Sequence, residues 1–162
     1  MDQPQIPVPV VEMPRSMARA RIDDKGRIKL AADYLHFFDA LPERKVFVTS
    51  TDRRIAEIYP IASWRKMEDF HAKNEKLPSV RRAAFNAARF GAECEVDSQG
   101  RVSVNSELRR ELGLDGQELH VYPYNRNRIR ILTAAAYEAS TLDAETADPN
   151  QDEDELLAAG RP

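Results

Sequence analysis

The stretch Ile22-Asp23-Asp24-Lys25-Gly26-Arg27-Ile28-Lys29-Leu30 decides the fold, because it occurs twice in the chain. It returns as Val96-Asp97-Ser98-Gln99-Gly100-Arg101-Val102-Ser103-Val104, with Asp97 standing 74 residues after Asp23. The correspondence continues at an offset of 73 residues, where Val46-Phe47-Val48 matches Leu119-His120-Val121, Ile58 matches Ile131 and Trp64 matches Tyr137. Two copies are too few for a solenoid, so the repeat predicts a pseudo-two-fold pair within one domain.

Each copy predicts the same order of elements. The Asp-x-x-Gly-Arg motif indicates a tight turn in which Gly26 or Gly100 takes a positive φ. Alternating apolar and polar residues on both sides of it indicate short strands. A helical segment follows at about 32–39 and 105–112, and the second one ends near Gly113. Two more strands complete each copy, and because so few elements cannot bury a core alone, the two copies are expected to interlock.

The chain is predicted to divide into five parts. They are an extended proline-rich arm (1–16), a first repeat (17–60), a helical linker (61–90), a second repeat (91–140) and an acidic, disordered tail (141–162). The linker is divided at Pro78, and Ser79 can cap its second helix. Its small residues fit either a packing surface between copies or subunits, or ordinary core helices.

The net charge of the chain is an average over unlike segments. The 162 residues carry 24 Lys and Arg against 27 Asp and Glu, which gives −3. Residues 143–162 hold seven acids and one base, so the remaining body carries +3. The total therefore does not exclude a nucleic-acid binder. The tail fits either a solubilising disordered end or a mimic of DNA that competes for the basic face.

Several classes of protein are not expected from this sequence. No apolar run is long enough for a membrane span, and residues 1–16 lack the pattern of a secretory signal. A single cysteine, Cys94, fits a reducing cytoplasm and is expected to face inward, buried and unreactive. Three scattered histidines show no metal-ligand spacing. With no phosphate loop and no nucleophile–base arrangement, we expect no enzyme, no cofactor, no metal and no small-molecule substrate.

The two motifs, together with the stretch from Arg81-Arg82 through Arg89 to Ala92-Glu93-Cys94, resemble the MraZ family of bacterial transcriptional regulators. The resemblance covers roughly residues 17–140. It implies an α+β fold of two AbrB-like swapped-hairpin β-barrel motifs, interleaved as an intrachain pseudo-dimer with a helical linker. The chain departs from the family's pattern at Ala31 and Asn105-Ser106, where a proline usually follows each Gly-Arg strand.

The resemblance also implies a function. Members bind double-stranded DNA at short direct repeats in the promoter of the division and cell-wall gene cluster, as a ring-like homo-oligomer. Such a protein works in the cytoplasm, associated with the nucleoid and not with a membrane. The alternative is an AbrB-type antitoxin, or another interaction module, whose partner contacts residues 1–16 or 141–162.

Basic residues of the first repeat are the candidates for DNA contact. Arg27 ranks first because its guanidinium can form bidentate bonds to a guanine edge or a phosphate, whereas Lys25 at the turn tip suits the DNA backbone. The full candidate set is Arg27, Lys25, Arg101, Lys29, Arg21 and Arg19, with Asp23, Gly26, Asp97 and Gly100 supporting the motif. The second repeat has Glu93 and Glu95 where the first has Arg19 and Arg21, so the first repeat is expected to be the stronger phosphate-binding surface.

Bland roles for the same residues stay open at this point. Each motif Asp could simply bond its Arg across the turn, with or without a role for that Arg at DNA. A strand carrying Arg126, Arg128 and Arg130 favours a solvated outer face. Three arginines of the linker, Arg81, Arg82 and Arg89, are expected to serve the linker or a subunit contact and not DNA.

Overall fold

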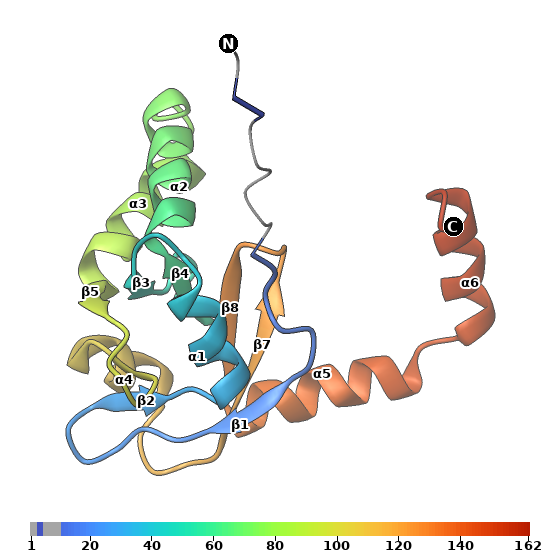
Figure 1. The fold of residues 1–162 in the computed structure, drawn as a ribbon. Helices are drawn as coiled ribbons and strands as arrows, with labels where there is room; N and C mark the ends of the chain where they lie inside the picture. Colours follow the sequence, from blue (N-terminus) through green and yellow to red (C-terminus); the bar gives the residue numbers. More distant parts are fainter. Residues whose placement is uncertain (1–2, 5–10) are drawn as a thin grey trace.

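The computed structural model describes residues 3–4 and 11–162, which form an α+β architecture (Figure 1). The strands are β1 (Ala18–Ala20), β2 (Arg27–Lys29), β3 (Lys45–Thr49), β4 (Ala56–Pro60), β5 (Ala92–Glu95), β6 (Arg101–Ser103), β7 (Leu119–Tyr124) and β8 (Arg128–Leu132). The helices are α1 (Ala32–Asp39), α2 (Ile61–Lys73), α3 (Pro78–Phe90), α4 (Ser106–Leu112), α5 (Ala134–Thr146) and α6 (Pro149–Ala158). Much of the predicted arm, residues 1–16, lies outside the described residues.

Six strands form one antiparallel sheet in the order β1-β7-β8-β4-β3-β5, and β2 pairs with β6 in a separate two-stranded ribbon. Each repeat contributes four strands, and the sheet order reads the same when the strands of the two repeats are exchanged. The first strand of each repeat pairs with the third strand of the other. Within the described residues β1 and β5 are the two edges, so the sheet is open and the expected closed barrel is not formed.

The register of the pairs follows the same symmetry. Ala18 lies opposite Val121, and its counterpart Ala92 lies opposite Val48. In the ribbon, Ile28 lies opposite its own counterpart Val102. The internal repeat seen in the sequence therefore corresponds to equivalent backbone pairings in space.

The main core consists of the apolar positions that alternate along these strands. Ile28 and Val102 are 0% and 1% exposed, and α1 and α4 add Tyr34 and Leu108, both 0% exposed. Burying a side chain of this size contributes about 1.5–3 kcal/mol, so the ribbon is held to the sheet by apolar contact. Cys94 faces this core but is only half-buried, where a buried side chain was expected, and burial raises the pKa of its thiol.

A smaller apolar cluster joins α2 and α3 to the sheet. The Trp64 ring lies 4.6 Å from that of Phe47 and 4.9 Å from that of Tyr59, measured between centroids. The corresponding pair in the second repeat, His120 and Tyr137, stacks with centroids 3.7 Å apart. The match of Trp64 with Tyr137 in the sequence thus corresponds to equivalent ring contacts in the two repeats, Trp64 with Phe47 and Tyr137 with His120.

The chain beyond the second repeat differs from the prediction of a disordered tail, because residues 134–146 and 149–158 are helical. Thr133 caps α5 by accepting a hydrogen bond from the Ala136 N–H at 3.1 Å. Asp148 caps α6 in the same way at the Asn150 N–H, 2.9 Å away, and Pro149 occupies the first helical position. These local start signals outweighed the acidic composition on which the prediction of disorder rested.

Candidate nucleic-acid interface

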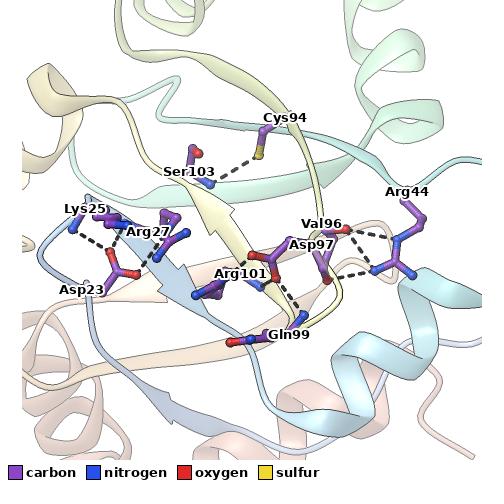
Figure 2. Close-up of polar contacts among 10 residues, drawn as sticks. All are labelled: Asp23, Lys25, Arg27, Arg44, Cys94, Val96, Asp97, Gln99, Arg101 and Ser103. Atoms are coloured by element: carbon purple, nitrogen blue, oxygen red, sulfur yellow. Dashed lines mark hydrogen bonds and ion pairs between the residues drawn. The ribbon is translucent and has the colours of Figure 1, made fainter.

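The two Asp-x-x-Gly-Arg turns have the same internal geometry (Figure 2). In the first, Asp23 Oδ1 accepts hydrogen bonds from the backbone N–H groups of Lys25 and Arg27, both at 2.9 Å. Its Oδ2 accepts from Arg27 Nε at 3.0 Å. The second turn repeats this at Asp97, with Arg101 Nε at 2.6 Å. The Asp–Arg bond that the sequence left open is therefore present in both copies.

These bonds favour the ionised carboxylates. Hydrogen bonds from the Arg101 backbone N–H, its side chain and the Gln99 N–H lower the pKa of Asp97 to about 2. The same arrangement lowers the pKa of Asp23 from its ordinary value. Each turn also needs its glycine, since Gly26 and Gly100 have φ of +76° and +78° as predicted. Near neutral pH a carboxyl group with so low a pKa is already ionised, so it has no proton to donate as a general acid.

The Asp bond uses only one of the nitrogens of each guanidinium. Among the described residues, the Nη atoms of Arg27 and Arg101 have no acidic or carbonyl partner. Their side chains remain 26% and 28% exposed. The carboxylate thus orients each guanidinium while its two terminal nitrogens stay available as hydrogen-bond donors.

The β2–β6 ribbon brings candidates from both repeats together. Arg27 lies opposite Ser103, and Lys29 lies opposite Arg101, so these four side chains share the face that points away from buried Ile28 and Val102. Lys25 is exposed at the adjoining turn. We call the surface made by Lys25, Arg27, Lys29 and Arg101 the ribbon face.

The two remaining candidates lie apart from the ribbon face. Arg19 is on β1, in the six-stranded sheet, and its Nε lies 3.6 Å from Glu118 Oε1. Arg21 is exposed just beyond the end of that strand. On β5 of the second repeat, Glu95 lies opposite Lys45 of β3, and Glu93 lies opposite Phe47 of the same strand. The positive charge that the sequence assigned to one face is thus divided between two sheets.

Two further arginines support the turns and were not singled out from the sequence. The Arg109 guanidinium lies so close to Gly26 that a Cβ there would be 2.9 Å from its Cζ, and it pairs with Asp115 at 2.9 Å. Arg44 donates to the carbonyl oxygens of Val96 and Asp97 at 2.9–3.1 Å. The sequence held one signal for the role of Arg109, because this charged residue stands where the first repeat has the apolar Leu35.

The expectation of a solvated outer face on β8 is wrong for Arg128 and Arg130. Both approach the buried carboxylate of Glu57, with Nε–Oε2 distances of 2.9 and 3.2 Å. Their side chains are only 13% and 22% exposed. Arg130 also lies 3.5 Å above the centre of the Tyr124 ring. These arginines are structural, because both pair with the one carboxylate of Glu57 on the neighbouring strand.

The described residues contain neither a metal-ligand cluster nor a membrane-spanning helix. Residues 3–4 and 11–162 hold no group of three or more His, Cys, Asp or Glu side chains arranged to bind a metal ion. None of the helices described combines the length and the apolar character that a bilayer crossing needs.

Comparison with known proteins gives a consistent group of relatives. The chain is 35% identical over 97 residues to the transcriptional regulator MraZ of Acidobacterium capsulatum, covering 59% of this chain and 66% of that one. It is 36% identical over 102 residues to the MraZ of Koribacter versatilis, covering 60% and 67%. A longer match, to the MraZ of Nitrosomonas europaea, is 25% identical and covers 81% and 95%. The chain thus spans about two thirds of the length of the first two relatives. No family model matches it.

Proposed function

The chain belongs to the MraZ family of transcriptional regulators, and we propose that it acts by binding double-stranded DNA with the ribbon face. The observation that carries the proposal is the clustering of Arg27, Lys29 and Arg101 on one side of a two-stranded ribbon whose other side is buried, with Lys25 exposed at the adjoining turn. Arginine forks read guanine edges or phosphates, and lysines contact phosphates. Arg21 and Arg19, on and beside β1, would contribute a second and separate group of positive charge.

The proposed architecture is two AbrB-like swapped hairpins interleaved as a pseudo-dimer within one chain. Its support is the strand order, which is unchanged when the two repeats are exchanged, and the cross-pairing of β1 with β7 and of β5 with β3. A pseudo-two-fold axis then passes between Ile28 and Val102 in the ribbon. The ribbon face lies on that axis, where both repeats can reach a single stretch of DNA.

The proposed mode of action is multivalent. One ribbon offers few phosphate contacts, so a single chain would bind weakly and with strong dependence on salt. A ring-like homo-oligomer that presents several ribbons to short direct repeats would gain about 100-fold or more through effective concentration. The proposed target is the promoter of the division and cell-wall gene cluster, and the proposed location is the cytoplasm, at the nucleoid.

The test compares Arg27→Ala with its matched counterpart Arg101→Ala. The two changes remove equivalent Asp–Arg bonds, so each variant is the control for the loss of that bond in the other. The first repeat has Lys25 and Lys29 where the second has Gln99 and Ser103, so we expect the loss of DNA affinity to be greater for Arg27→Ala. A loss of about 1–3 kcal/mol corresponds to a guanine contact.

The measurement is a titration of a promoter fragment carrying the direct repeats, at several salt concentrations, alongside the oligomer size of each variant. Loss of affinity for the repeats with affinity for random DNA retained indicates a base contact by Arg27. A uniform loss with a shallower salt dependence indicates a phosphate contact. Normal binding by Arg27→Ala at physiological salt would show that the ribbon face is not the site.

A second candidate function, an antitoxin-like interaction module, has one observation in its favour. The extension formed by α5 and α6 buries none of its residues. That candidate predicts that a foreign protein binds the extension and that the ribbon variants bind it normally.

A further inference from the structure

Helix α6 has apolar side chains that the rest of the described chain leaves uncovered. Leu156 and Leu157 are 48% and 56% exposed, and none of its residues is buried. The helix has 10 residues, and isolated helices of that length are marginal in water. In Figure 1, α5 carries α6 away from the sheet, to the side opposite α2 and α3. A partner outside this chain would therefore stabilise α6.

The exposed leucines of α6 lie beside acidic residues. Asp152 and Glu153 each stand one helical turn before Leu156 and Leu157, which places a carboxylate and a leucine on the same side of the helix. Among the described residues, Glu153 forms an ion pair with Arg161, and Asp152 forms none. The surface that α6 offers therefore combines two exposed leucines with carboxylates one helical turn before them.

A surface of the opposite charge lies on α3. A hollow of about 370 Å³ is lined by Arg53, Pro78, Arg81, Arg82, Phe85 and Asn86, and we call it the α3 hollow. Phe85 is 67% exposed within it. The Asn86 side chain donates to the Thr51 carbonyl at 2.9 Å, which holds the β3–β4 loop against α3.

The charge of the α3 hollow is positive. None of its six lining residues is acidic, although Glu111 pairs with Arg53 at 2.7 Å from outside it. One guanidinium nitrogen of Arg81, Nη1, donates to the carbonyl oxygens of Glu75 and Lys76, at 3.0 and 2.9 Å. Arg82 is exposed and forms no ion pair among the described residues. The hollow thus combines an exposed aromatic ring with arginine donors.

We propose that the α3 hollow binds α6 of a second copy of this chain, with the leucines against Phe85 and the acids against Arg81 and Arg82. The inference rests on the proposed self-association and names the two surfaces through which copies of the chain would associate. Because the two surfaces differ, the contact is head-to-tail, and such contacts close into rings when the rotation between copies permits.

Nucleic acid is the competing occupant of the α3 hollow. A phosphate backbone would engage the arginines but would leave Phe85 exposed, and it would leave Leu156 and Leu157 of α6 uncovered. A second copy covers the apolar side chains on both surfaces and pairs the charges as well. The exposed apolar residues therefore favour the chain itself over DNA.

The experiment uses two full-length variants that each damage one side of the contact. The hollow variant carries Arg82→Glu and Phe85→Asp, and the tail variant carries Leu156→Asp and Leu157→Asp. All four positions are exposed, so circular dichroism and the urea midpoint should match those of the wild type. Lys66→Glu, an exposed charge reversal on α2 outside the hollow, is the matched control.

Sedimentation velocity over a range of concentrations then measures self-association. We expect each variant alone to show an apparent dissociation constant raised by about tenfold or more, with Lys66→Glu unchanged. An equimolar mixture should form a 1:1 pair that grows no further, because it contains one intact hollow and one intact α6. Wild-type association by either variant, or no pairing in the mixture, would overturn the proposal.

A DNA titration of the same variants separates the alternatives. Loss of DNA affinity by the hollow variant, with self-association retained, would show that the hollow is a nucleic-acid surface and would also overturn the proposal. Failure of the pairing test leaves the ribbon face unaffected, because Arg27→Ala is scored by DNA affinity and not by assembly.

Discussion

At the scale of single residues, the motif aspartates do most to define the candidate interface. Asp97 accepts two backbone N–H groups and one guanidinium nitrogen, all within four residues of itself. The sequence could predict this bond because all its partners are local. The bond and a DNA contact are compatible, since the carboxylate leaves two guanidinium nitrogens free.

The lowered pKa of Asp97 predicts how its contribution depends on pH. Its folded pKa of about 2 lies below the ordinary 3.8, so the stabilisation is fully present well above pH 3.8 and is lost as pH falls through 2. The difference in urea midpoint between the wild type and Asp97→Asn should therefore be largest near neutral pH and shrink towards pH 2. Asp24→Asn, at an exposed carboxylate, is the control. A difference independent of pH would contradict this assignment.

Gly91, between α3 and β5, has a steric role. Its φ is −81°, so its backbone would accept other residues, but a Cβ would fall on the Phe47 ring and 2.5 Å from the Ala87 carbonyl oxygen. We expect Gly91→Ala to lower the free energy of unfolding by about 1–3 kcal/mol through overpacking. Chemical denaturation measures this, and Phe47→Leu in the same background should recover part of the loss. An unchanged urea midpoint for Gly91→Ala would contradict this prediction, because it would show that the Phe47 ring and the Ala87 carbonyl make room for the added Cβ at no cost.

At the scale of elements, the seam between β4 and β8 carries the buried charges. Glu57, Arg128 and Arg130 come from equivalent strands of the two repeats. The Tyr59 hydroxyl donates to Glu57 at 3.0 Å, and burial raises the pKa of that hydroxyl above its ordinary range. The sequence showed only an alternation of arginines, since their carboxylate partner lies about 70 residues earlier in the chain.

Removing the carboxylate from this seam should be costly. Glu57→Ala leaves two largely buried guanidinium groups without a counter-charge, so we expect a loss of about 3–5 kcal/mol in the free energy of unfolding. The control is Glu118→Ala, which breaks an exposed pair with Arg19 and should cost less than about 1 kcal/mol. Equal effects in urea denaturation would mean that the seam is not held by Glu57.

Helix boundaries show the limits of local signals. Asn105 caps α4 by accepting from the Glu107 N–H at 2.8 Å, and Gly113 ends that helix with φ of +63°, as expected. Asn105 thus supplies a local start signal where the family's usual proline is absent. The predicted cap at Ser79 is wrong, because α3 begins one residue earlier at Pro78. A proline at the first helical position has no N–H that a cap would need to satisfy, so the helix begins at Pro78 without a side-chain cap.

At the scale of the whole molecule, the two repeats are alike in backbone and unlike in charge. The ribbon gathers cations from both repeats, whereas the edge strands differ, with Arg19 on β1 and Glu93 and Glu95 on β5. The extension beyond β8 is helical but contributes no buried residue. Stability and assembly should therefore be separable.

Deletion of residues 147–162 tests that separation. No buried side chain is removed, so the free energy of unfolding should change by less than about 0.5 kcal/mol. Self-association should weaken, because α6 is the proposed ligand of the α3 hollow. Urea denaturation and sedimentation velocity on the same samples measure the two effects, and a destabilised body with intact assembly would reverse both expectations.

The sequence by itself determined the repeat, the two turns and the inward alternation of the core strands, and it offered the Asp–Arg bonds as one of the roles left open for those residues. The tertiary structure decided which cations share a face. Arg27 and Arg101 share one face of the ribbon, Arg128 and Arg130 both pair with Glu57, and Arg109 covers Gly26. These contacts depend on the register between distant strands, and that register is set only when both repeats pack around one core.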